Sequence, residues 1–391
     1  MNALYEYQQL ILSQINTSFL RYKYYELDWN RRVFGIVGPR GVGKTTMVLQ
    51  YIKQNLSLQD SLYITLDHIY FSTHTLIDVA DKFYKEGGKH LIIDEVHKAL
   101  NWSVQLKQII DSYPNMQIIF TGSSVLDIYR GVADLSRRAP IYDMQGLSFR
   151  EYLVLYHGIQ APTLNLDDLI NQRVTLPNIE HPLPLFKDYL KRGYYPFERI
   201  ASDFSTNLMQ VINRTMETDI PLYANINISV ARKLQNLLVV IAESVPFKPN
   251  YKKLAEITGI SRNDIADYIY YMERAGMLMS LHDTTQGIRS IGKSHKLYVD
   301  NTNLMYVLSP ENIDKGNLRE TFFLNQMRVK YPVTASQKAD FEIGNYIFEV
   351  GGKNKNQKQL DNNPDGYIVK DDIEFGYRNV IPLWAFGLTY L

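Results

Sequence analysis

Cysteine is absent from this chain of 391 residues, so neither a disulfide nor a thiolate metal site can form. An excess of one charge is also absent, because 42 Lys and Arg residues balance 41 Asp and Glu residues to a formal net charge of +1. This balance argues against binding nucleic acid through overall charge and leaves only a local basic surface for that purpose. No uninterrupted apolar run approaches the ~20 residues that a membrane-spanning helix needs.

The first residues also lack a feature, the basic segment and apolar core of a signal peptide. We therefore expect a soluble cytoplasmic protein that does not engage a membrane. Hydrophobic residues make up 45% of the chain, and its length allows two or three domains with substantial cores.

One stretch, Gly38 to Thr45, fits the phosphate-binding pattern G-x-x-x-x-G-K-[ST]. It follows an apolar run at 33–37, which predicts a buried strand, and precedes 46–52, which predicts a helix. Glycines let backbone N–H groups turn toward phosphate oxygens, and a helix N-terminus adds partial positive charge. The alternative is a glycine-rich turn that matches by chance, but the strand before it and the helix after it favour a nucleotide site.

Each residue type in this stretch has a role in holding a nucleoside triphosphate. Lys44 can reach the terminal phosphates, and Thr45 offers a hydroxyl to a magnesium ion. The predicted nucleotide-binding residues are Gly38, Pro39, Arg40, Gly41, Val42, Gly43, Lys44, Thr45 and Thr46.

Strand-like apolar runs recur at 33–37, 62–66, 91–93 and 117–120, with helical patterns between them. This alternation predicts a parallel sheet between helices. The third run ends in Asp94 and Glu95, where open α/β sheets place ligands. Asp94 would hold magnesium, directly or through water, and Glu95 would polarise the attacking water. The alternative is an ordinary helix N-cap.

Three further residues are candidates for catalysis. Ser123, just after the fourth run, would either position water near the terminal phosphate or cap the next helix. Arg137 and Arg138 supply adjacent guanidinium groups, one of which would act as an arginine finger within the chain or across a subunit boundary. A surface ion pair is equally compatible with these arginines.

The strings GPRGVGKTT, LIIDEVHK…NW, IIFTGSS and LSRRA…LSFREYL together resemble one family of bacterial and archaeal AAA+-type ATPases, which carries an uncharacterised C-terminal region. The resemblance covers most of residues 30–155 in the same order. It implies a AAA+-type core over 1–160 that binds and hydrolyses ATP with magnesium. Lys44 and Thr45 match the family's Walker A positions, and Asp94 and Glu95 match Walker B.

Residues 161–245 begin in a proline-containing loop and continue with helical periodicity, which predicts a helical bridge comparable to a AAA+ lid. Residues 246–305 predict a winged helix: a short helix over 251–257, a second helix over 262–275 with Ser261 as its N-cap, and a hairpin. The hairpin is basic because it carries Arg289, Lys293 and Lys296. Either the second helix and the basic hairpin contact DNA, or the module packs against protein. Asp264, Asp267 and Glu273 weaken the case for DNA by repulsion.

Residues 306–391 predict a small α+β domain similar to restriction endonucleases. Within it, 340–350 predicts a hairpin that turns at Gly344-Asn345 and places Asp340 opposite Glu349 on one face. Opposed carboxylates suit a cation, and this pair looks like the metal-binding half of a PD-(D/E)xK nuclease, with Glu320 as a third acid. The motif lysine is missing, because Gly351 stands in its position and the nearest lysine is Lys353.

These patterns predict an α/β P-loop ATPase core with a helical lid, followed by a winged helix and a nuclease-like domain. The leading hypothesis is magnesium-dependent ATP hydrolysis that drives a conformational switch on nucleic acid. A nucleotide-gated protein-interaction switch, with a protein partner or a second copy of the chain, is the first alternative. An ATP-licensed, metal-dependent nuclease is the second.

Overall fold

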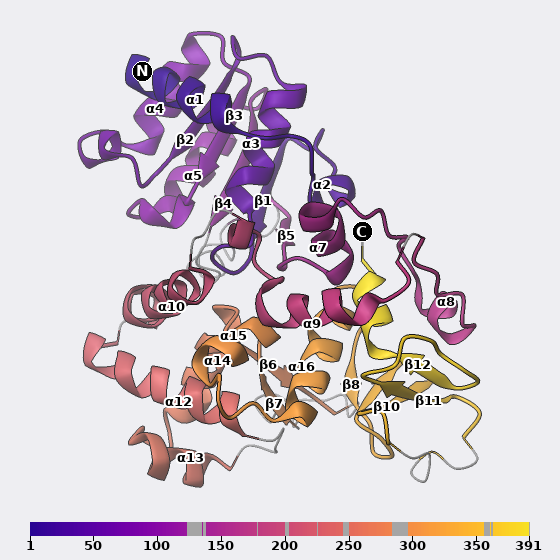
Figure 1. Ribbon diagram of the computed structural model, residues 1–391. Helices are drawn as coiled ribbons and strands as arrows, with labels where there is room; N and C mark the ends of the chain where they lie inside the picture. The colour runs from indigo at the N-terminus through magenta and orange to yellow at the C-terminus, as the bar shows by residue number, and fades with distance from the viewer. Residues whose placement is uncertain are drawn as a thin grey trace. The chain divides into compact units, whose positions relative to one another are not determined.

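The computed structural model describes residues 1–122, 135, 138–177, 179–199, 203–224, 226–244, 250–283, 296–355, 360 and 363–390. The chain divides into two compact units, Met1–Gly146 and Leu147–Leu391 (Figure 1).

A five-stranded parallel sheet forms the centre of the first unit, in the order β2-β3-β4-β1-β5. The strands are β1 (Val33–Val37), β2 (Ser61–Thr65), β3 (His90–Asp94), β4 (Gln117–Gly122) and β5 (Ile141–Asp143). Nearly every residue of the first four strands is buried, as expected for parallel strands covered on both faces. These four confirm the predicted strands. The sequence did not reveal β5, because it has only three residues, none of them fully buried.

Helices and 3-10 turns precede β1 and connect the strands. They are α1 (Asn2–Gln14), α2 (Tyr22–Glu26), α3 (Lys44–Asn55), η1 (Ile69–Ser72), α4 (Leu76–Lys85), η2 (Val96–Lys98) and α5 (Trp102–Ser112). Strand β4 lies between β1 and β3, with Val37 paired to Gly122 and Ile93 paired to Phe120. The carboxyl ends of these three strands therefore lie at one edge of the sheet, where the phosphate-binding loop and Asp94 emerge.

The second unit begins with helices, as predicted for this part of the chain. They are α7 (Phe149–His157), α8 (Leu166–Ile170), α9 (Pro182–Arg192), η3 (Pro196–Arg199), α10 (Phe204–Arg214), the π-helical turn η4 (Thr215–Asp219), α11 (Ile220–Ala224), η5 (Ile228–Val230) and α12 (Ala231–Glu243). Helix α7 falls inside the predicted ATPase core yet belongs to this unit, where the Phe149 ring contacts Phe186 and Tyr189. The finer domain limits, at 161–245, 246–305 and 306–391, stay predictions.

Two short helices and a hairpin follow: α13 (Tyr251–Thr258), α14 (Ile265–Arg274), β6 (Leu278–Leu281) and β7 (Lys296–Val299). Strands β6 and β7 pair antiparallel, and α13 ends at Gly259 in the left-handed conformation. The predicted N-cap Ser261 is wrong: its Oγ accepts the N–H of Asn263, and its carbonyl accepts the N–H of Asp264. These bonds close a turn, so α14 begins three residues later than predicted. Arg289 and Lys293 lie outside the described residues.

A mixed five-stranded sheet, in the order β12-β11-β10-β9-β8, completes the second unit. The elements are α15 (Thr302–Leu308), α16 (Lys315–Met327), β8 (Thr334–Ala335), β9 (Phe341–Ile343), β10 (Tyr346–Gly351), β11 (Gly366–Lys370), β12 (Val380–Pro382) and η8 (Leu383–Leu388). Phe323 of α16 packs against Phe341, Phe348 and Phe386, with ring centroids 4.8, 5.4 and 4.9 Å away. This aromatic cluster joins the helix to the sheet.

The hairpin of β9 and β10 has the predicted register. Phe341 pairs with Phe348 and Ile343 with Tyr346, and Gly344 in the two-residue turn has a φ of 60°. Asp340 lies just outside this ladder: its N–H donates to the carbonyl of Phe348, and its Oδ2 accepts the N–H of Val350. The predicted register is confirmed as far as Phe341 and Phe348, and the placement of both carboxylates on one face stays a prediction.

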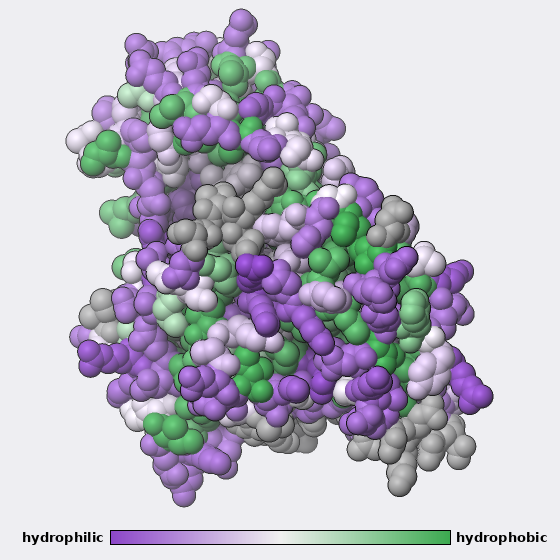
Figure 2. All heavy atoms as spheres, in the orientation of Figure 1, coloured by the Kyte–Doolittle hydropathy of each residue, from purple (hydrophilic) through white to green (hydrophobic). Residues whose placement is uncertain are grey.

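Hydrophilic side chains cover much of the visible surface in Figure 2. The large hydrophobic side chains that remain exposed include Leu10, Ile69, Leu100 and Phe375. Among the described residues, no helix is both long enough and apolar enough to cross a membrane.

Candidate functional site: a phosphate-binding loop and a buried aspartate

The loop between β1 and α3 has the backbone that its glycines predict. Gly38, Gly41 and Gly43 have φ angles of 153°, 84° and 94°, which side-chain-bearing residues rarely adopt. A Cβ on Gly38 would lie 2.1 Å from the carbonyl oxygen of Met144, so this position also needs glycine for space. The loop therefore brings backbone N–H groups and the N-terminus of α3 to one place, as a phosphate site requires.

Lys44 is the first residue of α3 and is only 6% exposed. Its ammonium donates to the carbonyl oxygens of Gly38 and Pro39, each at 2.8 Å. These bonds hold the ammonium group at the loop, where it can contact a bound phosphate.

Arg21 fastens the same loop from outside and was not predicted from the sequence. Its side chain is 4% exposed; one Nη donates to the carbonyl of Val42 and the other to that of Gln145, at 2.8 Å. No local motif marks this residue, because its partners lie far along the chain. Among the other predicted loop residues, Val42 is buried, Arg40 is half-buried and Thr46 is exposed.

Asp94, at the end of β3, is the centre of the polar contacts in the first unit. Its Oδ2 accepts the hydroxyls of Thr45 at 2.9 Å and Tyr63 at 2.8 Å, and its Oδ1 accepts the hydroxyl of Thr121. The carboxyl is 3% exposed, and burial raises its pKa, while the Thr121, Tyr63 and Thr45 hydrogen bonds act in the opposite direction. The structure thus joins the two predicted magnesium ligands, Thr45 and Asp94.

Tyr63 and Thr121 are the contributors that sequence reasoning assigned no individual role. Thr121 carried a signal, since it opens the polar stretch that ends the fourth strand. Tyr63 carried none that a single sequence reveals, because an aromatic residue within a buried strand predicts core packing. Its hydroxyl instead reaches the carboxylate at the end of the neighbouring strand.

Glu95 follows Asp94 with a φ of 53°, a left-handed conformation that is rare outside glycine. Its N–H donates to the Thr121 hydroxyl at 3.4 Å, and its Oε2 lies 3.3 Å from Nε2 of His97. The two acidic neighbours therefore differ in their surroundings. Asp94 is enclosed by hydroxyl groups, whereas Glu95 turns its backbone sharply and lies beside an imidazole.

A cavity of about 520 Å³ adjoins these carboxylates. Helix α1 contributes Tyr7 and Ile11 to its wall, and the rings of Tyr7 and His68 are in contact at 4.8 Å. Its lining residues are Tyr7, Ile11, Thr45, Leu49, Tyr63, Thr65, Asp67, His68, Ile69, Asp94 and Glu95. The space beside Thr45 and Glu95 is large enough for an attacking water and its surroundings.

The remaining predicted catalytic residues are not brought to this site by the described structure. Ser123 and Arg137 lie outside the described residues. Arg138 forms a two-bond ion pair with Asp111, Nε to Oδ1 at 2.9 Å and Nη2 to Oδ2 at 3.3 Å. Of the two roles open for Arg138, the structure contains the ion pair.

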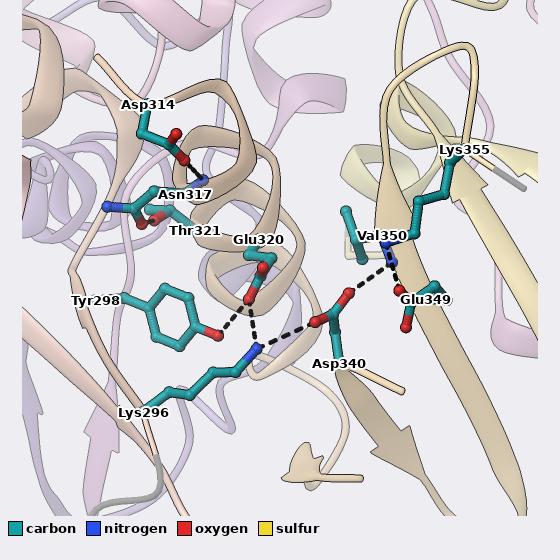
Figure 3. A network of polar contacts seen from close by, with 10 residues as sticks. All are labelled: Lys296, Tyr298, Asp314, Asn317, Glu320, Thr321, Asp340, Glu349, Val350 and Lys355. Atoms are coloured by element: carbon teal, nitrogen blue, oxygen red, sulfur yellow. Dashed lines mark hydrogen bonds and ion pairs between the residues drawn. The ribbon is translucent and has the colours of Figure 1, made fainter. Parts of the chain in front are cut away.

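The second unit holds a separate cluster of charged side chains (Figure 3). Lys296 of β7 bridges Glu320 of α16, at 3.0 Å, and Asp340, at 3.1 Å. The hydroxyl of Tyr298 also donates to Glu320, at 2.7 Å. Burial raises the pKa of Glu320, and the nearby Asp340 raises it further. Burial alone would lower the pKa of Lys296, but the two carboxylates outweigh it and raise that pKa.

Lys355 supplies the cation on the other side of this cluster. Its Nζ lies 2.5 Å from Oε1 of Glu349, and Figure 3 shows its side chain reaching back along β10. A Cβ on Gly351 would lie 2.7 Å from Cγ and Cδ of Lys355. The side chain of Lys355 therefore fills the space that a residue-351 side chain would occupy. The sequence named Lys353 as the nearest lysine, and the structure brings Lys355 instead.

Each of the three acids in this cluster thus pairs with a lysine, and Glu320 and Asp340 share Lys296. Glu349 is 4% exposed and its pKa is raised, mainly by burial. Within the described part of the chain, no group of three or more His, Asp or Glu side chains is arranged to hold a metal ion. The metal site at Asp340 and Glu349 stays a prediction.

Of two matches to family models, the one with a functional description falls on the first unit. Residues 30–153 match a family model described as an AAA domain, and residues 183–314 match a domain of unknown function, DUF8612. With the loop and the Thr45–Asp94 pair, the first match defines an AAA-type P-loop domain of the ATPase class. The second match carries no functional description.

Comparisons with individual proteins cover more of the chain than the first unit. The uncharacterized protein MJ1637 of Methanocaldococcus jannaschii is 26% identical over 323 residues, which cover 74% of this chain and 66% of that protein. A Walker-type ATPase of Pyrococcus abyssi has a TM-score of 0.45 and 11% identity, over 73% of this chain and 94% of its own. The Hsp104–ADP complex of S. cerevisiae has a TM-score of 0.28 and 16% identity, over 65% and 38%. At these scores neither structure carries an argument about activity.

Proposed function

We propose that the chain hydrolyses ATP in a magnesium-dependent reaction at the loop of the first unit. The observation that carries the proposal is the 2.9 Å hydrogen bond between Thr45 and Asp94, beside the ammonium of Lys44. Hydroxyl and carboxylate oxygens are the donors that Mg²⁺ prefers, so Thr45 and Asp94 fit this ion. When bound, the ion would neutralise charge on the terminal phosphates.

The chain's own residues supply the remaining steps. Lys44 exchanges its two carbonyl partners for phosphate oxygens, and the loop N–H groups orient the phosphates. Glu95 orients the attacking water and accepts its proton as the water oxygen bonds to the terminal phosphorus. The bond from that phosphorus to the bridging oxygen breaks, and ADP leaves with the electron pair.

The test is turnover by Glu95→Gln. This variant keeps the phosphate contacts and removes the water-orienting carboxylate, so ATP binding should persist while hydrolysis falls about 10²- to 10⁴-fold. Glu86→Gln, a change on the exposed end of α4, is the matched control. Hydrolysis at the parental rate by Glu95→Gln would refute this assignment.

We further propose that hydrolysis drives a conformational switch that acts on nucleic acid. Support comes from α13, α14 and the β6–β7 hairpin, whose order of two helices and a hairpin is that of a winged helix. Arg262 and Tyr270 are exposed here, and the Arg274 guanidinium lies 5.3 Å from the Tyr270 ring centroid. Lys296 does not serve this surface, because Glu320 and Asp340 bind it.

Salt dependence separates this switch from one that acts on a protein partner. Affinity for duplex DNA should fall steeply between low and physiological salt, and changing Arg262, Arg289 and Lys293 together to Ala should weaken binding. Measuring the ATPase rate with and without DNA, for the parent and for the variants, then tests whether the two units are functionally coupled. DNA affinity that does not change with salt favours the protein-interaction switch, whose partner is either another protein or a second copy of this chain.

A third candidate, metal-dependent cleavage of nucleic acid, is favoured by one observation. Lys355 lies 2.5 Å from Glu349 and fills the space above Gly351, where the nuclease pattern places its lysine. Lys355 is thus a candidate for the lysine that the nuclease pattern requires and that position 351 lacks. Nicking of plasmid DNA with Mn²⁺, lost in both Glu349→Ala and Lys355→Ala, tests it; no nicking by the parental chain leaves the cluster a structural ion-pair network.

A further inference from the structure

His97 is a buried ionisable residue that the proposed hydrolysis does not yet use. It lies in η2, two residues after Glu95, and its side chain is 3% exposed. Neither ring nitrogen forms a well-aligned hydrogen bond with the described part of the chain, although Nε2 lies 3.3 Å from Oε2 of Glu95. A buried imidazole without aligned partners is unusual enough to require an explanation.

The imidazole is neutral at physiological pH. Burial lowers the pKa of His97 to about 4, and the positive charges of Lys98, Arg40 and Lys44 contribute in the same direction, against the carboxylate of Glu95. A neutral imidazole carries one N–H donor and one acceptor nitrogen. With its hydrogen on Nε2, the ring can donate to Oε2 of Glu95 after a small rotation of either side chain.

The backbone of Glu95 is also held in a fixed, unfavourable conformation. Its φ of 53° is one that side-chain-bearing residues keep only where their surroundings determine it. The Thr121 hydroxyl, 3.4 Å from the Glu95 N–H, constrains the main chain. His97 stands at the other end of the residue, beside the carboxylate.

We propose that His97 is a positioning residue for Glu95. Its neutral imidazole donates Nε2–H to the Glu95 carboxylate and holds that carboxylate in the orientation that directs the attacking water. The inference rests on the proposed ATP hydrolysis and adds a residue to it. No contact of His97 with substrate or metal is involved. We expect the nucleotide-binding residues to keep their contacts when His97 is changed.

The experiment compares His97→Leu with His97→Gln. Leucine has a similar size and no donor, whereas the glutamine amide nitrogen reaches about as far as Nε2. For His97→Leu, kcat should fall between about tenfold and 100-fold, since a misplacement of 1 Å can cost about 100-fold, while ATP affinity stays parental. His97→Gln should recover most of the lost kcat.

A double variant distinguishes positioning from general support of the fold. In a Glu95→Gln background, His97→Leu should cause no further loss of kcat, because the residue acts only through that carboxylate. A parental kcat for His97→Leu, an equal loss in His97→Gln, or a further loss in the double variant would each overturn the inference. If Glu95→Gln itself turns over at the parental rate, the proposed hydrolysis mechanism fails instead, and the two failures are distinct.

Discussion

The hydroxyl of Thr45 and the carboxylate of Asp94 are joined by a 2.9 Å hydrogen bond, although 49 positions separate them in the chain. Thr45 lies in the first turn of α3, which follows β1, and Asp94 ends β3. Strand β4 lies between those two strands, so the contact exists only because the sheet places β1, β4 and β3 side by side. Two oxygen donors that a magnesium ion can share are thereby brought together.

Lys44→Ala should abolish nucleotide binding or weaken it severely. The change removes the ammonium that now bonds to Gly38 and Pro39 and that would bond to phosphate. Titration with a fluorescent ATP analogue measures the effect. Lys82→Ala, on the exposed face of α4, is the control and should bind as the parent does. Equal affinity in both variants would contradict the role of Lys44.

Tyr63→Phe should lower the free energy of unfolding of the first unit by about 1–3 kcal/mol, because a buried carboxylate loses one of its hydroxyl donors. The lost bond is the 2.8 Å contact with Oδ2 of Asp94. Urea unfolding followed by fluorescence measures the change, with Tyr25→Phe, at an exposed position, as the control. An unfolding curve equal to the parent's would show that the hydroxyls of Thr45 and Thr121 are sufficient hydrogen-bond donors for the Asp94 carboxylate.

The pKa of His97 predicts a loss of stability in mild acid. Its folded value, about 4, lies below the usual value of 6.5, so the unfolded chain binds the proton more readily. This contribution to stability is complete above pH 6.5 and is lost as the pH falls toward 4. Its full size is about 3 kcal/mol, at about 1.4 kcal/mol per pKa unit.

Unfolding measured from pH 7 to pH 4 tests the His97 contribution. In His97→Leu, stability should fall less steeply with acid than in the parent, because no buried imidazole has to take up a proton. His74→Leu, at an exposed position, should keep the parental slope. Identical slopes for the parent and His97→Leu would contradict the prediction.

Divalent metal, if it binds the cluster of the second unit, should bind more weakly after Asp340→Asn. Calorimetric titration with Mn²⁺ is best carried out on an Asp94→Asn background, so that only this cluster remains. Asp365→Asn, the same change at an exposed position just before β11, is the control. Absence of any Mn²⁺ binding would show that the ion pairs with Lys296 and Lys355 exclude a metal ion from this cluster.

The sequence by itself determined the features that depend on local rules. The loop from Gly38 to Thr45, four of the parallel strands and the Gly344-Asn345 hairpin follow from spacing, glycine conformation and the alternation of side chains along a strand. The N-cap of α14 also depends on local rules, but its prediction was wrong. A serine can cap a helix or close a turn, and the hydrogen bonds of Ser261 close a turn.

Only the tertiary structure decided which distant side chains meet. Tyr63 reaches Asp94 because β2 pairs with β3, Arg21 reaches the loop from before β1, and Lys355 folds back over Gly351 to Glu349. None of these contacts has a spacing rule in sequence, since each depends on chain reversals and on the space that neighbouring residues leave. Local chemistry therefore predicts where a phosphate can bind, while packing selects the groups that surround its carboxylates.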